Sequence, residues 1–142
     1  MHGCYNGIGL WFVEGIAGIR VHASEEPALT IRAGIDAGDL EWASGHRAAL
    51  HGMAHSSWLV GGGGFTHNIT VPGNGLARVL IPCGVDGVNS VTESGTALKK
   101  AIGVQVRGTG SECEAVVNGV RHVELAVRSG RYRFASTWRR AT

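Results

Sequence analysis

The clearest structural signal in this 142-residue chain is Met53-Ala54-His55-Ser56-Ser57-Trp58-Leu59-Val60-Gly61-Gly62-Gly63-Gly64-Phe65-Thr66-His67-Asn68-Ile69-Thr70-Val71. Two strand-like runs flank four glycines, which supply the positive φ angles that a tight hairpin turn requires. In the second run the apolar residues Phe65, Ile69 and Val71 alternate with polar ones. This alternation is expected of a strand with one buried and one solvated face. The stretch therefore predicts a β-hairpin.

Strand-like runs recur along the rest of the chain, separated by turns that contain glycine or proline. They lie at about residues 29–33, 40–44, 77–82, 88–92, 103–106, 114–117, 123–127 and 132–135. We expect Pro72-Gly73-Asn74-Gly75 to turn the chain between two of them. Short strands at this spacing are typical of antiparallel sandwiches. The predicted fold is mainly β: a two-layer antiparallel β-sandwich preceded by one N-terminal α-helix.

Residues 5–19 carry the periodicity of that helix. One stripe contains the apolar residues Ile8, Trp11, Phe12, Ile16 and Ile19. The glycines within the stretch are poor helix formers, each costing roughly 1 kcal/mol relative to alanine. We therefore expect the helix to depend on tertiary packing. The predicted organisation is a helical segment 1–23, a β-sandwich 24–138 and a tail 139–142.

The composition excludes several classes of protein. Charged residues make up 17% and hydrophobic residues 44% of the chain, so disorder is not expected. The net charge is +2, and no aromatic platform interleaves with the arginines near the end, so we expect no nucleic-acid partner. No signal peptide is recognised, and no apolar run approaches the ~20 residues of a membrane span. We expect no membrane partner and, by default, a cytoplasmic location.

The cysteines Cys4, Cys83 and Cys113 are odd in number and widely spaced. They form no metal-ligand pattern, so reduced and mostly buried thiols are expected. His51 and His55 share a strand face, but no third ligand is placed beside them. The sequence therefore predicts neither a metal site nor a cofactor.

Several short motifs occur in order along the chain. They comprise His2, Tyr5, Gly9, Trp11 and Ala17-Gly18-Ile19 in the helix, followed by Leu40-Glu41-Trp42-Ala43-Ser44, His51 to Trp58, Gly64 to Asn74, Val91-Thr92-Glu93-Ser94-Gly95 and Ser129-Gly130-Arg131-Tyr132-Arg133-Phe134. This ordered set resembles the C-terminal region of bacterial α-L-rhamnosidases. The resemblance implies the last helix of an (α/α)6 catalytic barrel, represented by residues 1–23, followed by the family's C-terminal β-sandwich.

The resemblance has consequences for function. The family consists of inverting glycosidases whose acid and base carboxylates lie in the barrel, which this sequence lacks. Met1 stands where the family has asparagine, so we expect a start codon within the barrel helix. A non-catalytic structural or accessory domain is the main hypothesis. A module that binds rhamnose-containing glycans and a subunit of a split rhamnosidase are the alternatives. His2 is the one substrate-binding residue that the resemblance implies, and no catalytic residue is expected.

Other candidate residues have less specific signals. Inverting hydrolysis requires two carboxyl groups about 6.5–9.5 Å apart, and no spacing singles out a pair among the eleven Asp and Glu residues. Ser56 and Ser57 near His55 lack the sequence of a nucleophile elbow. Trp42 and Trp58 fit either a sugar platform or core anchors, and we expect both in the core.

The expected partners follow from the apolar stripe of the helix. Its Trp and Phe side chains are costly to leave in water. We expect the stripe to be buried against the sandwich, a second copy of the chain or a separately encoded catalytic barrel. A carbohydrate is a further expected partner.

Overall fold

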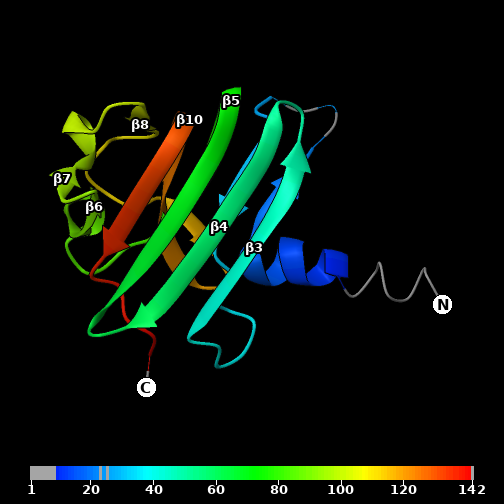
Figure 1. Ribbon diagram of the computed structural model, residues 1–142. Coiled ribbons are helices and arrows are strands. Elements are labelled where there is room, and N and C mark those ends of the chain that lie inside the picture. The colour runs from blue at the N-terminus through cyan, green and yellow to red at the C-terminus, as the bar shows by residue number, and fades with distance from the viewer. Residues whose placement is uncertain (1–8, 23, 25, 142) are drawn as a thin grey trace.

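The computed structural model describes residues 9–22, 24 and 26–141 of the chain. The predicted mainly β fold with one N-terminal helix is confirmed (Figure 1). The elements in chain order are η1 (Phe12–Ala17), β1 (Ile19–Val21), β2 (Leu29–Arg32), β3 (Trp42–Ala49), β4 (Gly52–Gly61), β5 (Gly64–Pro82), η2 (Gly87–Ser90), β6 (Val91–Glu93), β7 (Thr96–Ala97), η3 (Leu98–Lys100), β8 (Val104–Val106), β9 (Ala115–Val117) and β10 (Val120–Ser136).

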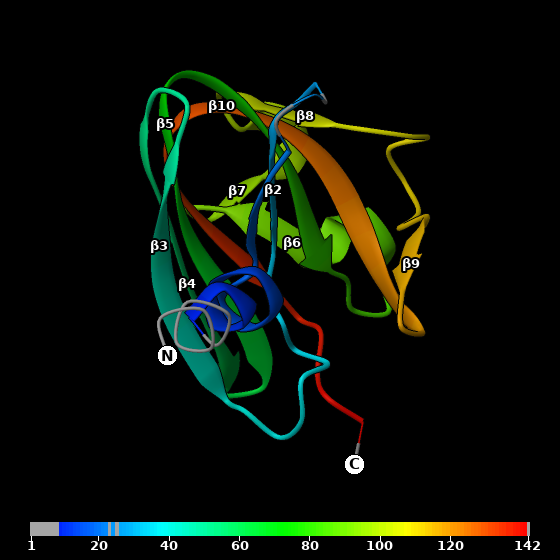
Figure 2. The same cartoon turned by 90° about the vertical axis from the view of Figure 1, so that its right-hand side faces the viewer.

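Two long strands, β5 and β10, belong to both layers of the fold. The first part of β5 pairs with β4, and β4 pairs with β3, while the last part of β10 pairs with β6. In the other layer the second part of β5 pairs with β2, and the first part of β10 pairs with β8 and β9. Figure 2 shows β5 and β10 bending from one layer into the other. The ten strands found in the described residues are thus connected by pairing, although they pack as two layers.

The predicted hairpin is confirmed, but the turn expected at residues 72–75 is wrong. β4 and β5 pair from His55 opposite Thr70 to Gly61 opposite Gly64. β5 then continues through residues 72–75 without reversing. Its pairing with β10 is shifted there, since Val71 lies opposite Gly130 and the next paired residue, Leu76, lies opposite Arg128. The extra residues form a bulge that bends the strand, because a bulge increases local twist without ending the pairing.

One strand pairing departs from the antiparallel pattern. β1 and β2 are antiparallel, whereas β2 runs parallel to β5, with Leu29 opposite Ala77 and Arg32 opposite Leu80. Parallel neighbours need a long crossover connection. Here that connection is the β3–β4 hairpin and the first part of β5.

The helix is confirmed for residues 9–17, but it is not α-helical throughout and it ends earlier than expected. Phe12–Ala17 is wound as a π-helix, and Ile19 begins β1. Gly18 ends the helix with φ 92°, and its N–H donates to the carbonyl oxygen of Val13 at 2.8 Å. A side chain at Gly18 would collide with the backbone of Arg32. Glycine at this position therefore permits both the left-handed backbone and the close contact with β2.

The core lies between the two layers and is apolar. Its largest fully buried side chains include Trp58, Phe65, Phe134, Ile31 and Leu125. Ile16 and Ile19 join this core from the N-terminal segment, which buries one part of the predicted stripe. Within the described ranges, no helix has the length and apolar character needed to cross a membrane.

The prediction of reduced cysteines is wrong for two of the three, because Cys83 and Cys113 form a disulfide. Cys83 follows the end of β5, and Cys113 precedes β9. Both strands pair with His122 of β10, through Pro82 on one side and Ala115 on the other. The pairing of three strands thus brings together two residues that are 30 apart in sequence. Disulfides persist mainly in oxidising compartments, so the cysteines give no support to the expected cytoplasmic location.

Replacement of both cysteines, Cys83→Ala with Cys113→Ala, should lower the free energy of unfolding. A bridge between residues 30 apart in sequence restricts the unfolded chain, an effect of about 3–4 kcal/mol in the loop-entropy model. Urea unfolding of the variant and the oxidised wild type measures the difference. Wild type in reductant is the control and should match the variant. Alkylation of Cys83 and Cys113 in the denatured, unreduced chain would contradict the bridge.

Candidate functional site

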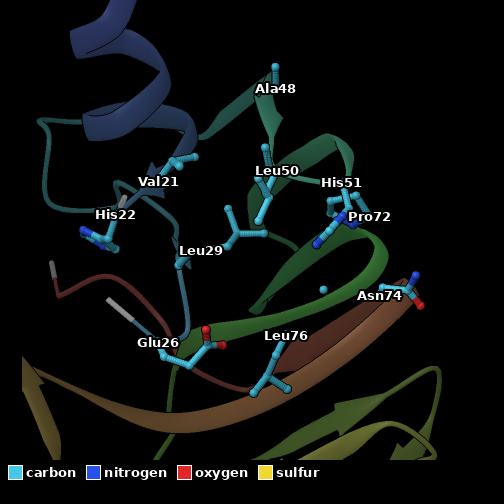
Figure 3. A pocket seen from close by; sticks show the side chains of 13 residues that line it. Val21, His22, Glu26, Leu29, Ala48, Leu50, His51, Pro72, Asn74 and Leu76 are labelled. Atoms are coloured by element: carbon cyan, nitrogen blue, oxygen red, sulfur yellow. The ribbon is translucent and has the colours of Figure 1, made fainter. Parts of the chain in front are cut away.

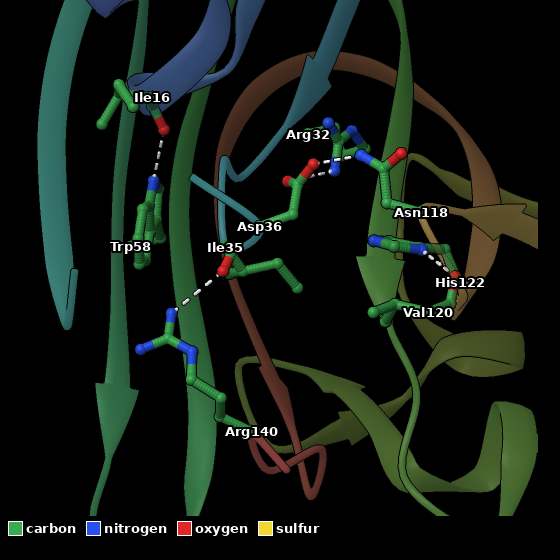
Figure 4. Close-up of polar contacts among 9 residues, drawn as sticks. All are labelled: Ile16, Arg32, Ile35, Asp36, Trp58, Asn118, Val120, His122 and Arg140. Atoms are coloured by element: carbon green, nitrogen blue, oxygen red, sulfur yellow. Dashed lines mark hydrogen bonds and ion pairs between the residues drawn. The ribbon is translucent and has the colours of Figure 1, made fainter. Parts of the chain in front are cut away.

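The junction between the helix and β4 contains a group of buried polar contacts. Trp58 Nε1 donates to the carbonyl oxygen of Ile16 at 2.8 Å (Figure 4), and Ser56 Oγ donates to that of Ala17 at 2.7 Å. Gly34 N–H also donates to Ile16, at 3.0 Å. The last carbonyls of a helix have no partners within it. Side chains of β4 and the backbone of the segment that follows β2 supply those partners here.

Ser56 also contacts His67, a residue that was not among the candidates from the sequence. Ser56 Oγ lies 2.7 Å from His67 Nε2, and both side chains are buried. The single hydroxyl proton of Ser56 is used toward Ala17, because a carbonyl can only accept. His67 must therefore donate its Nε2–H to Ser56. The remaining ring nitrogen, Nδ1, is then an acceptor, and it has no partner among the described residues.

With this direction of the hydrogen bond, Ser56 and His67 cannot act as a catalytic nucleophile and its general base. A base must present a lone pair to the serine hydroxyl, whereas His67 presents a proton. Burial also lowers the pKa of His67 to about 3, because the charged imidazolium would be desolvated. The pair therefore has a structural role. His55, the histidine that the sequence placed beside Ser56, is exposed instead and lies 5.7 Å from His46 between ring centres.

Three of the described carboxylates contact a cation or a backbone donor. Glu14 Oε1 lies 3.3 Å from Arg47 Nη1, and Glu124 Oε1 lies 3.1 Å from Arg78 Nη2. Glu114 accepts the N–H of Thr109 at 3.2 Å. Each of these side chains thus links two segments of the chain.

A second polar cluster lies at the ends of β2 and β9. Arg32 Nη1 donates to Asp36 Oδ1 at 3.0 Å, and Asn118 donates to the other carboxylate oxygen of Asp36 (Figure 4). Burial would raise the pKa of Asp36, but the hydrogen bond and charge of Arg32 outweigh it, so this pKa is lowered. His122 Nδ1 donates to Val120 at 2.9 Å, and burial lowers its pKa. An ionised Asp36 beside a neutral histidine ties the β9–β10 turn to β2.

A pocket of about 440 Å³ lies where β1, the β3–β4 turn and the β5 bulge meet (Figure 3). Its walls are largely aliphatic, with Leu29, Leu50 and Leu76 among them. His22 and Glu26 lie on one side, and His51 and Asn74 on the other. Glu26 is the one carboxylate among the described lining residues, so this pocket does not supply the pair that inverting hydrolysis requires. A smaller pocket of about 200 Å³ contains Glu112, Glu114 and Glu124 together with Arg107.

The two tryptophans that we expected in the core have different environments. Trp58 is 1% exposed, as expected, but Trp42 is 65% exposed, so that part of the prediction is wrong. The register explains the difference. Trp58 lies opposite Ala43, whereas Trp42 lies opposite Leu59. Because successive residues of a strand point to opposite faces, the face that buries Trp58 and Ala43 requires Trp42 to point outward.

The remaining candidate residues give no evidence of chemistry. His2 lies outside the described residues. His51, like His55, is exposed, and no group of three or more His, Cys, Asp or Glu side chains in the described ranges could hold a metal ion. Within the expected tail, Arg140 Nη2 donates to the carbonyl oxygens of Ile35 at 3.0 Å and Leu40 at 2.8 Å.

Sequence reasoning missed Ser56 and His67 as a buried pair, although a signal for them was present. Ser56 lies two residues from both Ala54 and Trp58, and His67 lies two residues from both Phe65 and Ile69. Period two therefore placed both polar residues on the apolar, inward faces of β4 and β5. No signal in the sequence indicated that their hydrogen bonds would reach the helix.

The fold and these contacts define a class of domain: a two-layer β-sandwich with a helix packed against one edge. Residues 28–96 match the family model of the bacterial alpha-L-rhamnosidase C-terminal domain. The predicted resemblance to the C-terminal region of these enzymes is thereby confirmed. A search of curated proteins gives no match.

Two solved structures are similar to the chain. The alpha-L-rhamnosidase from Dictyoglumus thermophilum is 22% identical, with a TM-score of 0.65, over 90% of this chain and 13% of that one. The Streptomyces avermitilis alpha-L-rhamnosidase complexed with L-rhamnose is 28% identical, with a TM-score of 0.63, over 92% of this chain and 11% of that one. The first likeness concerns the fold alone. The chain therefore spans about an eighth of the length of either enzyme.

The buried His67 should make stability depend on pH. Its pKa is about 3 in the folded chain against 6.5 in the unfolded chain, so the unfolded state binds one more proton between these values. The free energy of unfolding should then fall by about 1.4 kcal/mol for each pH unit below about 6. The contribution is fully present above pH 6.5 and is lost toward pH 3. The variant His67→Gln keeps an N–H donor and should have the smaller slope.

Urea unfolding between pH 4 and 7 measures this slope. His122 adds to the pH dependence of the free energy of unfolding in both wild type and His67→Gln, because burial lowers its pKa too. His55→Gln is the matched control, since His55 is exposed on the same hairpin, and its slope should equal that of wild type. Equal slopes for His67→Gln and wild type would show that His67 is not buried as a neutral imidazole.

Proposed function

We propose that the chain acts as a non-catalytic accessory domain of a rhamnosidase-type glycoside hydrolase, and that its helix docks on a helical catalytic domain. The observation that carries this proposal is the state of the helix, which is fixed at one end and open on one face. A subunit of a split rhamnosidase is one form of the proposal, in which the catalytic domain is a separate polypeptide.

The fixed end of the helix supports a role as a rigid connector. Ile16, Ala17 and Gly18 accept hydrogen bonds from Trp58, Ser56 and Arg32 N–H, respectively. A buried hydrogen bond contributes about 1 kcal/mol net, so several together resist detachment of the helix. Glu14 adds an ion pair with Arg47 of β3. A domain docked through this helix would therefore be held at a defined orientation to the sandwich.

The open face of the helix supports a partner. Leu10, Trp11 and Phe12 are 48%, 62% and 41% exposed. They precede the buried Ile16 along the chain, so the apolar surface continues beyond the sandwich. Contiguous exposed aromatic side chains are typical of interaction sites. In Figure 1 the helix lies at the edge of the layer that contains β3, away from β6 and β7. A helical domain can pack on it there without displacing a strand.

The state of the carboxylates supports the non-catalytic part of the proposal. Glu14, Asp36 and Glu124 each form an ion pair with arginine. Carboxylates held by arginine in this way have a structural partner instead of a second carboxyl group facing them across a glycosidic bond, which inverting hydrolysis requires. The chain alone should therefore release no product from an aryl α-L-rhamnoside.

The helix proposal can be tested on the isolated chain. Without a catalytic domain, a second copy is the apolar partner left for Trp11 and Phe12, so the chain should dimerise reversibly. Trp11→Ser with Phe12→Ser should weaken this dimer by about tenfold or more, because aromatic side chains dominate such contacts. Sedimentation velocity over a range of concentrations measures the dissociation constant.

The control is Trp42→Ser with Leu59→Ser, which removes exposed apolar side chains from the outer sheet face and should leave the dimer unchanged. A wild-type chain that remains monomeric at high concentration would contradict docking through the helix. Cleavage of an aryl α-L-rhamnoside by the purified chain would contradict the non-catalytic role.

A further inference from the structure

The outer face of one layer has an unusual distribution of charge. Four adjoining segments of this face are β3, β4, residues 64–71 of β5 and residues 130–136 of β10, and β6, with Glu93, pairs with the far side of β10. These four strand segments contain no Asp or Glu. Arg131 and Arg133 lie two residues apart on β10, and both are exposed. They therefore point to the same side of the sheet, about 7 Å apart along the strand.

The register places polar side chains beside the two arginines. Arg133 lies opposite Asn68, and Arg131 lies opposite Thr70. On the next strand, Ser57 lies opposite Asn68, and His55 lies opposite Thr70. Amide and hydroxyl groups of this kind donate to and accept from the hydroxyl groups of a sugar.

Neither arginine is neutralised by an ion pair within the described ranges. The side-chain ion pairs there use Arg32, Arg47 and Arg78. Glu93 lies beside the face, where its carboxylate accepts the backbone N–H of Arg133 at 3.0 Å and the hydroxyl of Ser94 at 2.5 Å. The two guanidinium groups thus remain available to an anion, which they can hold in paired, charge-assisted hydrogen bonds.

A hollow of about 370 Å³ lies between these groups. Its lining includes Asn68, Thr70, Ser94, Arg131 and Arg133. The hollow is open to solvent, and its few polar groups can fix the orientation of a ligand bound there. The hollow is distinct from the aliphatic pocket at the β5 bulge, which contains none of these residues.

An exposed aromatic side chain completes the face. Trp42 points outward from β3. Its register partners on β4, β5 and β10 are, in order, Leu59, Thr66 and Ala135. At about 4.8 Å between strands, Trp42 lies about 14 Å across the sheet from the strand of the arginines. A ligand that reaches both is longer than one sugar. The indole offers a flat apolar surface for the face of one ring, while the arginines hold an acidic group of another.

We propose that this outer face binds an acidic oligosaccharide, with Arg131 and Arg133 holding the carboxylate of a uronic acid. Asn68, Thr70 and Ser94 bind the hydroxyl groups of the same ring, and Trp42 packs against a ring further along. The proposal extends beyond the accessory role and does not depend on the helix. The charge of the face favours a carboxylate-bearing glycan over a neutral one.

Titration calorimetry with a tetrasaccharide of galacturonic acid tests the proposal. Binding should be measurable at low ionic strength and should weaken with added salt, because exposed charges are screened. The carboxyl-reduced, neutral tetrasaccharide should bind at least about tenfold more weakly, since it lacks the charge-assisted hydrogen bonds. Equal binding of the acidic and neutral forms, or no binding of the acidic form, would overturn the proposal.

Variants locate the site. Arg131→Ala with Arg133→Ala should reduce affinity by about tenfold or more, and Trp42→Ala should reduce it for the tetrasaccharide but not for a single galacturonic acid. Arg20→Ala with Arg121→Ala is the matched control, since it removes the same charge from exposed residues of β1 and β10 in the other layer. Equal loss in the control would show a general charge effect and overturn the site.

Two further binding experiments distinguish this proposal from its alternatives. An eight-residue oligothymidine should bind more weakly than the acidic glycan, and equal or tighter binding would overturn the choice of a glycan. Trp11→Ser with Phe12→Ser should leave glycan binding unchanged, so that failure of the helix proposal and failure of this one are distinguishable.

Discussion

The carbonyl oxygens at the end of the helix need donors, and the sandwich supplies them from its inner face. Ile16 accepts from Trp58 at 2.8 Å, and Ala17 accepts from Ser56 at 2.7 Å. A buried carbonyl without a partner costs about 1–3 kcal/mol, so these contacts set where the helix can end. Once they are made, Gly18 must turn in the left-handed region and β1 must begin at Ile19. The direction of the helix, and hence its open face, follows from this junction.

The same junction determines the state of His67. Ser56 has one proton to give and uses it toward the helix, so His67 donates to Ser56, and burial keeps His67 neutral by lowering its pKa. A chain of hydrogen bonds therefore runs from β5 through β4 to the helix. Charging the imidazole would require a cation in the core. Ser56 thus connects the end of the helix to a buried histidine whose protonation should destabilise the fold.

The sequence predicted the parts of the fold that depend on local periodicity. The glycine-linked hairpin, the two-layer mainly β fold and the burial of Trp58 follow from alternation and turn residues. Features that depend on pairing between distant segments were predicted wrongly or were missed. Residues 72–75 have the composition of a turn, yet β10 continues to pair on both sides of them. Trp42 carried the same motif evidence as Trp58, and only the register with Leu59 shows that it points outward.

The disulfide and the candidate site also depend on pairing between distant segments, which the sequence does not indicate. Cys83 and Cys113 meet because β5 and β9 both pair with His122, which no spacing in the sequence indicates. The spacing of Arg131 and Arg133 places both on one face of a strand, but their neighbours Asn68 and Thr70 follow from the register alone. Alternation indicates which side of a strand a residue occupies, whereas register determines what stands beside it. Functional inference from this sequence therefore required the three-dimensional pairing.

The indole N–H of Trp58 is the group through which the helix junction can be tested most directly. Trp58→Phe keeps an aromatic ring in the core but removes the donor to Ile16, which retains the bond from Gly34. Urea unfolding should show a loss of about 1–2 kcal/mol, whereas Trp42→Phe on the exposed face should change stability by less than about 0.5 kcal/mol. Equal effects of the two substitutions would contradict an account in which this hydrogen bond anchors the helix.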